Sequence, residues 1–187
     1  MDLIEQLGIP HRRMAAYREL LALGPAALPS VRAGLKHANR AVRSLCVFFL
    51  DHYLTPEVLL DLIAMLDDPH PRVRLVALHA LACDRCKEGD CRPEEGAVLP
   101  RALAILANDP DPHVRAMAIE LIGRFVHTSV EAECALLSAK ADDPSPAVRK
   151  KAGWYAPGGT IHRRTAPRTP RRRPHSSSVQ QTIESPR

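Results

Sequence analysis

A Val-Arg pair opens a helical pattern four times along this chain of 187 residues, each time directly after a short turn. Successive pairs are 31, 41 and 34 residues apart. A period of this length is typical of repeat proteins, in which each unit buries its apolar face only against its neighbours. The pattern therefore predicts a quasi-linear stack with an extended surface. The four pairs are Val42-Arg43, Val73-Arg74, Val114-Arg115 and Val148-Arg149.

The residues ahead of each Val indicate how the turn ends and the helix begins. In the last three units a proline occupies the first helical position, where its missing amide proton is no loss and its φ is already helical. The residue directly before the helix is of a type preferred at the N-cap in three of the four units, and His70 is the exception. An Asp-Pro pair farther upstream ends the preceding helix, because a residue before proline is displaced from the α region. The prolines are Pro71, Pro112 and Pro146, the N-cap candidates are Asn39, Asp111 and Ser145, and the turn acids are Asp68, Asp109 and Asp143.

Apolar residues recur at three- and four-residue intervals on both sides of each turn, which is typical of amphipathic helices. One step before Val42 the pattern reaches Arg12-Arg13, which we interpret as a degenerate first unit. We therefore expect an all-α fold with a short N-terminal cap and four helical pairs, whose second helices line an inner surface. The first helices are expected at 26–37, 56–66, 97–107 and 130–140, and the second helices at 40–53, 71–83, 112–127 and 146–155.

The segment from Asp143 to Ala152, Asp-Pro-Ser-Pro-Ala-Val-Arg-Lys-Lys-Ala, resembles the HEAT repeat. It is most similar to the short HEAT-like repeats of phycobilin lyases and many bacterial proteins, and the resemblance covers most of residues 10–156. It implies a right-handed α-solenoid in which the repeat arginine pairs with a turn aspartate between adjacent units. The structural residues of the repeat turns are then Val42, Arg43, Asp68, Val73, Arg74, Asp109, Val114, Arg115, Asp143, Val148 and Arg149.

The formal net charge of +5 comes from the C-terminal segment. Residues 157–187 contain seven of the 26 Lys and Arg residues and one acid, Glu184, which leaves 19 bases and 20 acids in residues 1–156. A near-neutral solenoid argues against a DNA-binding fold, which would carry its bases on one folded face. The segment 157–187 lacks apolar periodicity, so we expect a disordered tail with weak, salt-sensitive contact to polyanions. The arginines considered for that contact are Arg163, Arg164, Arg171, Arg172 and Arg173.

The 41-residue step is longer than its neighbours because of an insertion at 83–95, which contains three of the five cysteines. Insertions in repeat arrays form loops along one edge and are often functional. Thiols are reduced in the cytosol, so three close cysteines suggest ligation of zinc or, as a weaker alternative, of an iron–sulfur cluster.

The cysteine spacing, Cys-x2-Cys-x4-Cys, is formed by Cys83, Cys86 and Cys91. A tetrahedral site needs a fourth ligand, which His79 could supply from the preceding helical turn or His52 from the neighbouring unit. Such a site would be structural, because four protein ligands leave no coordination position open for chemistry. Two other interpretations stay open: unligated thiols in an acidic recognition loop, and a disulfide such as Cys86 with Cys91.

The sequence contains no nucleophile elbow, no Gly-rich phosphate loop and no His-Glu-x-x-His motif. No stretch approaches the roughly 18–20 apolar residues of a membrane span, and the acidic start lacks the features of a signal peptide, which predicts a cytoplasmic protein. We expect a non-enzymatic scaffold for an unidentified protein partner, with no specific nucleic acid and no cofactor beyond the structural zinc considered above. Two alternatives remain: a HEAT-like lyase or other enzyme-associated subunit, and a nucleic-acid-associated protein acting through the basic tail.

Overall fold

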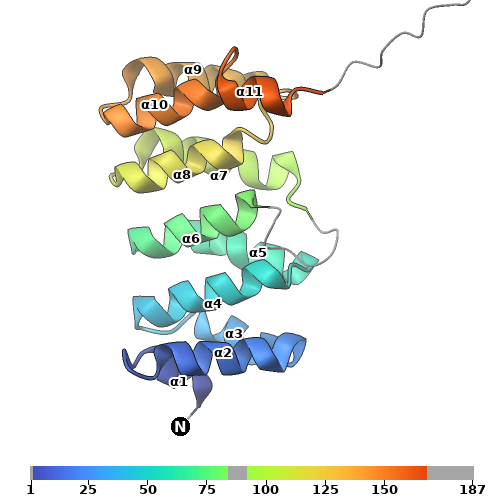
Figure 1. The fold of residues 1–187 in the computed structure, drawn as a ribbon, viewed down its shortest axis with the longest axis vertical. Helices are drawn as coiled ribbons and strands as arrows, with labels where there is room; N and C mark the ends of the chain where they lie inside the picture. The colour runs from blue at the N-terminus through green and yellow to red at the C-terminus, as the bar shows by residue number, and fades with distance from the viewer. Residues whose placement is uncertain (1, 84–91, 168–187) are drawn as a thin grey trace, which may run out of the picture.

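The structure, a computed structural model, describes residues 2–83 and 92–167. All regular structure in these two ranges is helical. The helices follow one another as a single stack of pairs, with the N-terminal pair at one end and the C-terminal pair at the other (Figure 1). The predicted all-α solenoid is confirmed.

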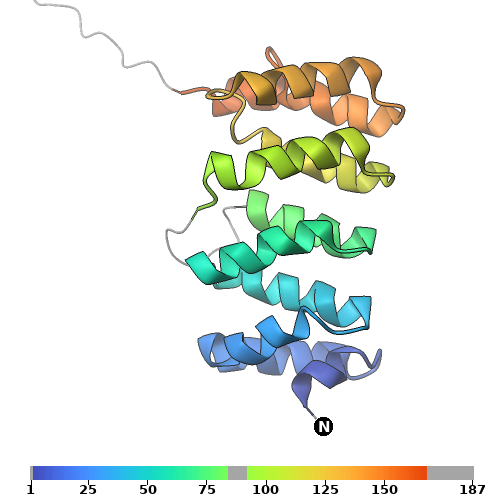
Figure 2. The same cartoon turned by 180° about the vertical axis from the view of Figure 1, so that it is seen from behind.

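Each of the five units consists of two helices joined by a turn. The second helices form one layer of the stack, which faces the viewer in Figure 1, and the first helices form the opposite layer, which faces the viewer in Figure 2. In chain order the units are α1 Leu3–Leu7 with α2 Arg13–Leu23, α3 Leu28–Gly34 with α4 Arg40–His52, α5 Pro56–Ala64 with α6 Pro71–Ala82, α7 Glu95–Asn108 with α8 Pro112–Ile122, and α9 Val130–Asp142 with α10 Pro146–Tyr155. Short 3₁₀ helices at Gly24–Ala27 and Met65–Asp67 extend α3 and α5, and α11 Thr160–Thr165 follows the last unit.

The second helices begin with side-chain caps, although not at every predicted residue. Asn39 and Asp111 accept hydrogen bonds from backbone N–H groups two residues later, at 2.9 and 2.8 Å. His70 was predicted not to cap, but its Nδ1 accepts from the N–H of Arg72 at 3.1 Å. A neutral imidazole nitrogen is an acceptor, so it can replace the amide oxygen of Asn39. Ser145 occupies the predicted N-cap position of α10, but its side chain makes no cap bond.

Most helix boundaries lie within about three residues of the prediction, and the two largest differences are near the C-terminus. α8 ends at Ile122 instead of residue 127, because the chain turns through residues 123–128 before Ser129 caps α9 by accepting from the N–H of Ala132. The tail predicted to begin at residue 157 contains α11, which packs against α10. The ordered part of the chain therefore extends beyond the predicted limit, and residues 168–187 lie outside the described ranges.

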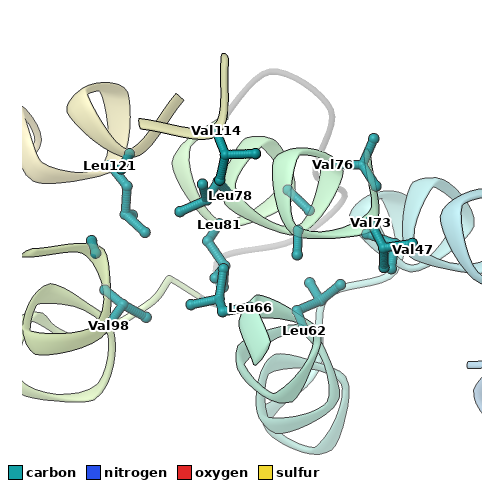
Figure 3. Close-up of a cluster of buried hydrophobic side chains, with 14 of the residues drawn as sticks. Val47, Leu62, Leu66, Val73, Val76, Leu78, Leu81, Val98, Val114 and Leu121 are labelled. Carbon is teal, nitrogen blue, oxygen red and sulfur yellow. The ribbon is translucent and has the colours of Figure 1, made fainter. Parts of the chain in front are cut away.

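The core is a continuous layer between the two rows of helices. All four repeat valines are fully buried. Figure 3 shows the core where the second, third and fourth units meet: Val98 of α7 faces Leu66 and Leu81 of the third unit, while Val47 of α4 lies beside Val73 of α6. Each unit thus completes the core of its neighbours and has none of its own, which is the property that makes a repeat stack.

Candidate interaction surface

Consecutive turns are joined by paired arginine and aspartate side chains along one edge of the stack. In the pair between the fourth and fifth units, Arg115 donates from Nε and Nη2 to the two carboxylate oxygens of Asp143, both at 2.9 Å. Bidentate pairs of this kind are stronger and more directional than single contacts. The other two pairs, each with distances of 2.7 and 2.9 Å, are Arg43 with Asp68 and Arg74 with Asp109.

Each of these arginines also holds the turn that precedes its own helix. Arg115 donates from Nη1 to the carbonyl oxygens of Asp109 at 2.9 Å and Pro110 at 3.4 Å. The aspartate in turn orders its own loop, since Asp143 Oδ1 accepts from the backbone N–H of Ser145 at 2.8 Å. One guanidinium therefore fixes two turns relative to one another, and the edge of the stack is preorganised.

The paired carboxylates are nearly buried, with side-chain exposures of 3% for Asp68 and 5% for Asp143. Burial opposes their ionisation, but the hydrogen bonds from arginine and from the backbone outweigh it, so the pKa of each lies below its usual value. The pKa values of Arg43 and Arg115 are raised, chiefly by hydrogen bonds to the same carboxylates. The Arg43–Asp68 and Arg115–Asp143 pairs are therefore ionised at neutral pH.

The row of pairs begins in the first unit with altered residues. Arg13 donates from Nε to the carbonyl oxygen of Leu7 at 2.9 Å, six residues back, which parallels the contact from Arg115 to Asp109. The turn of the second unit has His37 in place of an aspartate, and its Nδ1 accepts from the N–H of Asn39 at 2.9 Å. Arg13 therefore keeps the contact to the carbonyl oxygen of its own turn, but the next turn offers it a histidine and no aspartate.

The last unit ends the row differently. Arg149 donates from Nη1 to the carbonyl oxygens of Asp143 at 2.6 Å and Pro144 at 3.2 Å, as the inner arginines do in their own turns. Within residues 2–83 and 92–167 no further turn aspartate follows it.

A groove of about 1030 Å³ opens on the turn edge between the third and fourth units. Leu66, Ala104 and Ile105 provide apolar lining. Polar groups also line the groove, including Arg101, whose Nη1 forms an ion pair with Asp67. An apolar surface with a few charged groups is typical of a site that binds a ligand or a protein segment. The sequence did not predict this groove, because the groove depends on the distance in space between the turns of two units.

The predicted metal ligands are only partly described. Cys83 lies half-buried directly after α6, and its backbone N–H donates to the carbonyl oxygen of His79 at 2.8 Å. His52 is the last residue of α4. These three do not form a metal-binding group, and the described part of the chain holds no cluster of three or more candidate ligands. Cys86 and Cys91 lie outside the described residues, so the zinc site stays a prediction.

Two features at the far ends of the second helices were not predicted. Asp51 is only 2% exposed, and its Oδ2 lies 4.0 Å from Nε2 of His79. A hollow of about 560 Å³ between α6, α8, α10 and α11 is lined by charged and aromatic groups that include Arg124, His127 and Tyr155. Burial, together with the nearby charge of Glu120, raises the pKa of Tyr155 to about 12.

The predicted polyanion contacts fall in two places. Arg163 and Arg164 are exposed on α11, whereas Arg171, Arg172 and Arg173 lie outside the described residues. Among the helices that the structure describes, none combines the length and apolar character that a bilayer crossing requires.

Fold and turns together define the class of protein: an α-solenoid built from HEAT-like repeats. Residues 99–157, from within α7 to just past α10, match the family model of HEAT repeats. The chain is also similar in structure to a chain in the complex of CpcE and CpcF of phycocyanin lyase from Nostoc sp. PCC7120, with a TM-score of 0.63 and 23% identity over 80% of this chain and 93% of that one. A comparison with curated proteins finds no match. The predicted resemblance to HEAT-like repeats is confirmed.

Proposed function

We propose that this chain is a non-catalytic scaffold that binds a segment of a partner protein in the groove between the third and fourth units. The observation that carries the proposal is the groove itself, with a volume of about 1030 Å³ on a preorganised edge. Binding to a surface that is already ordered avoids part of the entropy cost of association.

The lining of the groove indicates the chemistry of the segment. Leu66 and Ile105 offer apolar contact, while Arg101, Asn108 and His113 provide polar groups. A segment with one or two apolar side chains between polar or charged ones fits this arrangement. The backbone of such a segment would find donors and acceptors among these polar groups.

A site-specific photo-crosslinker tests the proposal. Ala104 lines the groove, whereas Ala141 is exposed on α9 away from it, so both positions accept a benzophenone amino acid in an otherwise identical protein. We expect a discrete crosslinked product from position 104 and none from position 141 after irradiation in cells. The partner peptide from that product should then bind the purified wild-type chain and lose affinity on Ala104→Trp, which fills the groove. Equal crosslinking from both positions would contradict the proposal.

The cytoplasmic location belongs to the same proposal and is supported by the thiols of Cys46 and Cys134, which are free in the structure. We also propose that the cysteine insertion binds a structural zinc ion. Elemental analysis of protein purified without a polyhistidine tag should find close to one equivalent of zinc, which Cys86→Ser removes. Less than about a tenth of an equivalent contradicts the zinc proposal, given the tight binding expected of thiolate sites.

A second function, that of a lyase subunit, is favoured by the match to the phycocyanin lyase complex. A fold shared at 23% identity does not carry activity with it, because function depends on the site. The two functions are separated by incubating the chain with a bilin and a cysteine-containing acceptor protein. A covalent adduct that depends on this chain would replace the scaffold proposal.

The basic tail is the basis of the remaining alternative, association with nucleic acid. Deleting residues 168–187 removes five arginines and leaves the described solenoid intact. Retention on heparin that depends on the tail should be lost in this variant and should be sensitive to salt. Retention that survives the deletion would favour a basic surface on the folded part.

A further inference from the structure

We propose that the C-terminal end of the stack is a second binding site, separate from the groove, in which Arg149 receives a carboxylate from an acidic segment of another protein. The site goes beyond the proposed scaffold function, and its test does not depend on whether the groove is used. Arg149 is the last of the repeat arginines, and it occupies the same place in its unit as Arg43, Arg74 and Arg115 do in theirs.

Arg149 is held in the same way as the inner arginines. Its Nη1 bonds to two carbonyl oxygens of its own turn, at 2.6 and 3.2 Å, just as Nη1 of Arg115 bonds to the turn before α8. In Arg115 the remaining edge of the guanidinium, Nε and Nη2, binds both oxygens of Asp143. The corresponding edge of Arg149 has no carboxylate from the described residues. It is therefore a preformed bidentate receptor for a carboxylate.

The occupant is not another helical repeat stacked on the end. The inner units present Leu78 and Ile119, both fully buried, to the unit that follows them, whereas the fifth unit has Gly153 at the equivalent position. The stem of Lys140 lies against that glycine, with its carbons 3.8 to 3.9 Å from where a side chain would begin. Leu137 and Trp154 are exposed on α9 and α10, but at the position of Gly153 the last unit lacks the aliphatic side chain that the inner units bury. A further repeat would therefore lose that core contact.

A second copy of the chain does not supply the acid either. The turn of the first unit has Leu7 at the position that aspartate occupies in the inner turns, and Leu7 is fully buried. Head-to-tail stacking of two copies would therefore leave Arg149 without a carboxylate.

The charges at this end favour an acidic segment. Lys140 and Lys150 are exposed on α9 and α10, and Asp142, the last residue of α9, is an exposed acid beside the turn. Figure 1 shows α11 at the far end of α10, so it does not cover the turn that precedes Arg149. A segment with several Asp or Glu residues gains one bidentate contact and further attraction from the lysines.

The test uses the full chain and a fluorescein-labelled peptide with several Asp residues, with a matched peptide in which Asn replaces every Asp. Anisotropy titrations at physiological salt should show binding of the Asp peptide that weakens on the order of tenfold in Arg149→Gln, as expected for loss of a charged bidentate pair. Arg18→Gln, which removes an exposed arginine from α2 at the other end, should leave the affinity unchanged. Any contribution of the basic tail is common to all three proteins.

Two further readouts distinguish the receptor from general attraction. The Nε–Hε signal of Arg149 in a nitrogen–proton NMR spectrum should shift during the titration, and Arg149→Lys should bind more weakly than wild type because an ammonium group lacks the planar fork. Equal weakening by Arg18→Gln and Arg149→Gln would overturn the proposal. So would wild-type affinity in Arg149→Lys or equal binding of the Asn peptide.

Discussion

Each repeat arginine does more than form an ion pair. Arg115 is 8% exposed and bonds both to Asp143 in the next unit and to backbone carbonyls of its own turn. Loss of its side chain therefore leaves a buried carboxylate and a carbonyl group without their donors. Arg149 makes the carbonyl contacts alone, which provides a matched comparison within the same chain.

Replacing these two arginines separates the carboxylate contact from the carbonyl contacts. Arg115→Ala should lower the free energy of unfolding by about 3 kcal/mol, because a buried charge loses its partner. Arg149→Ala should cost about 1 kcal/mol, the scale of an ordinary hydrogen bond. Urea denaturation followed by circular dichroism measures both values. Similar costs for the two variants would show that the pair with Asp143 contributes little.

The pairs also predict how stability depends on pH. The pKa values of Asp68 and Asp143 lie below their ordinary value of 3.8 in the folded chain, so the folded chain binds protons less readily than the unfolded chain. Their contribution is complete above the ordinary pKa and is lost as pH falls through the lowered folded values. The free energy of unfolding should thus begin to decrease as the pH falls toward the ordinary value of 3.8, and should decrease further below it. In the double variant Asp68→Asn, Asp143→Asn the decrease should be smaller, and an unchanged decrease would assign it to other groups.

At the scale of helices, two glycines test how the last units pack. Both have helical backbone, so alanine is favourable for the helix itself, but a Cβ on Gly123 would lie 2.2 Å from Cδ1 of Tyr155. Gly123→Ala should destabilise the fold by about 1–3 kcal/mol through overpacking. Gly153→Ala meets only ordinary contacts and should stabilise it by about 0.5–1 kcal/mol. Thermal unfolding of the two variants gives the signs directly, and a stabilising Gly123→Ala would contradict the close contact with Tyr155.

The helices were predictable to the extent that their signals are local. Prolines at the first helical position and Asp-Pro turns locate the starts of α6, α8 and α10 at the predicted residues. The end of α8 was not predictable in this way, because the apolar pattern continues to Val126, which is buried beyond the helix. α11 is only six residues long, and its place against α10 depends on tertiary contact.

The site was less predictable than the fold. Resemblance to HEAT repeats implied pairing of Arg and Asp, but the bidentate geometry and the carbonyl contacts required the structure. The groove brings together residues of two different units that are far apart in the sequence, such as Leu66 with Ala104 and Asp67 with His113. No local sequence pattern predicts that these residues meet. The cysteine interpretation depends on Cys86 and Cys91, which fall outside the described ranges.

In the molecule as a whole, each unit is completed only by its neighbours, which follow one another in linear order. Three exposed residues mark the first, third and fifth units: Met14, Leu60 and Leu137, with exposures of 52%, 68% and 41%. Genetically encoded spin labels at these positions avoid the five native cysteines. Substitution at exposed positions should leave stability almost unchanged.

Pairwise distances between these labels, measured by pulsed electron paramagnetic resonance, test the linear stack most directly. The stack predicts that the distance from position 14 to position 137 is clearly the longest and close to the sum of the two shorter distances. Three similar distances, as in a globule with one shared core, would contradict it.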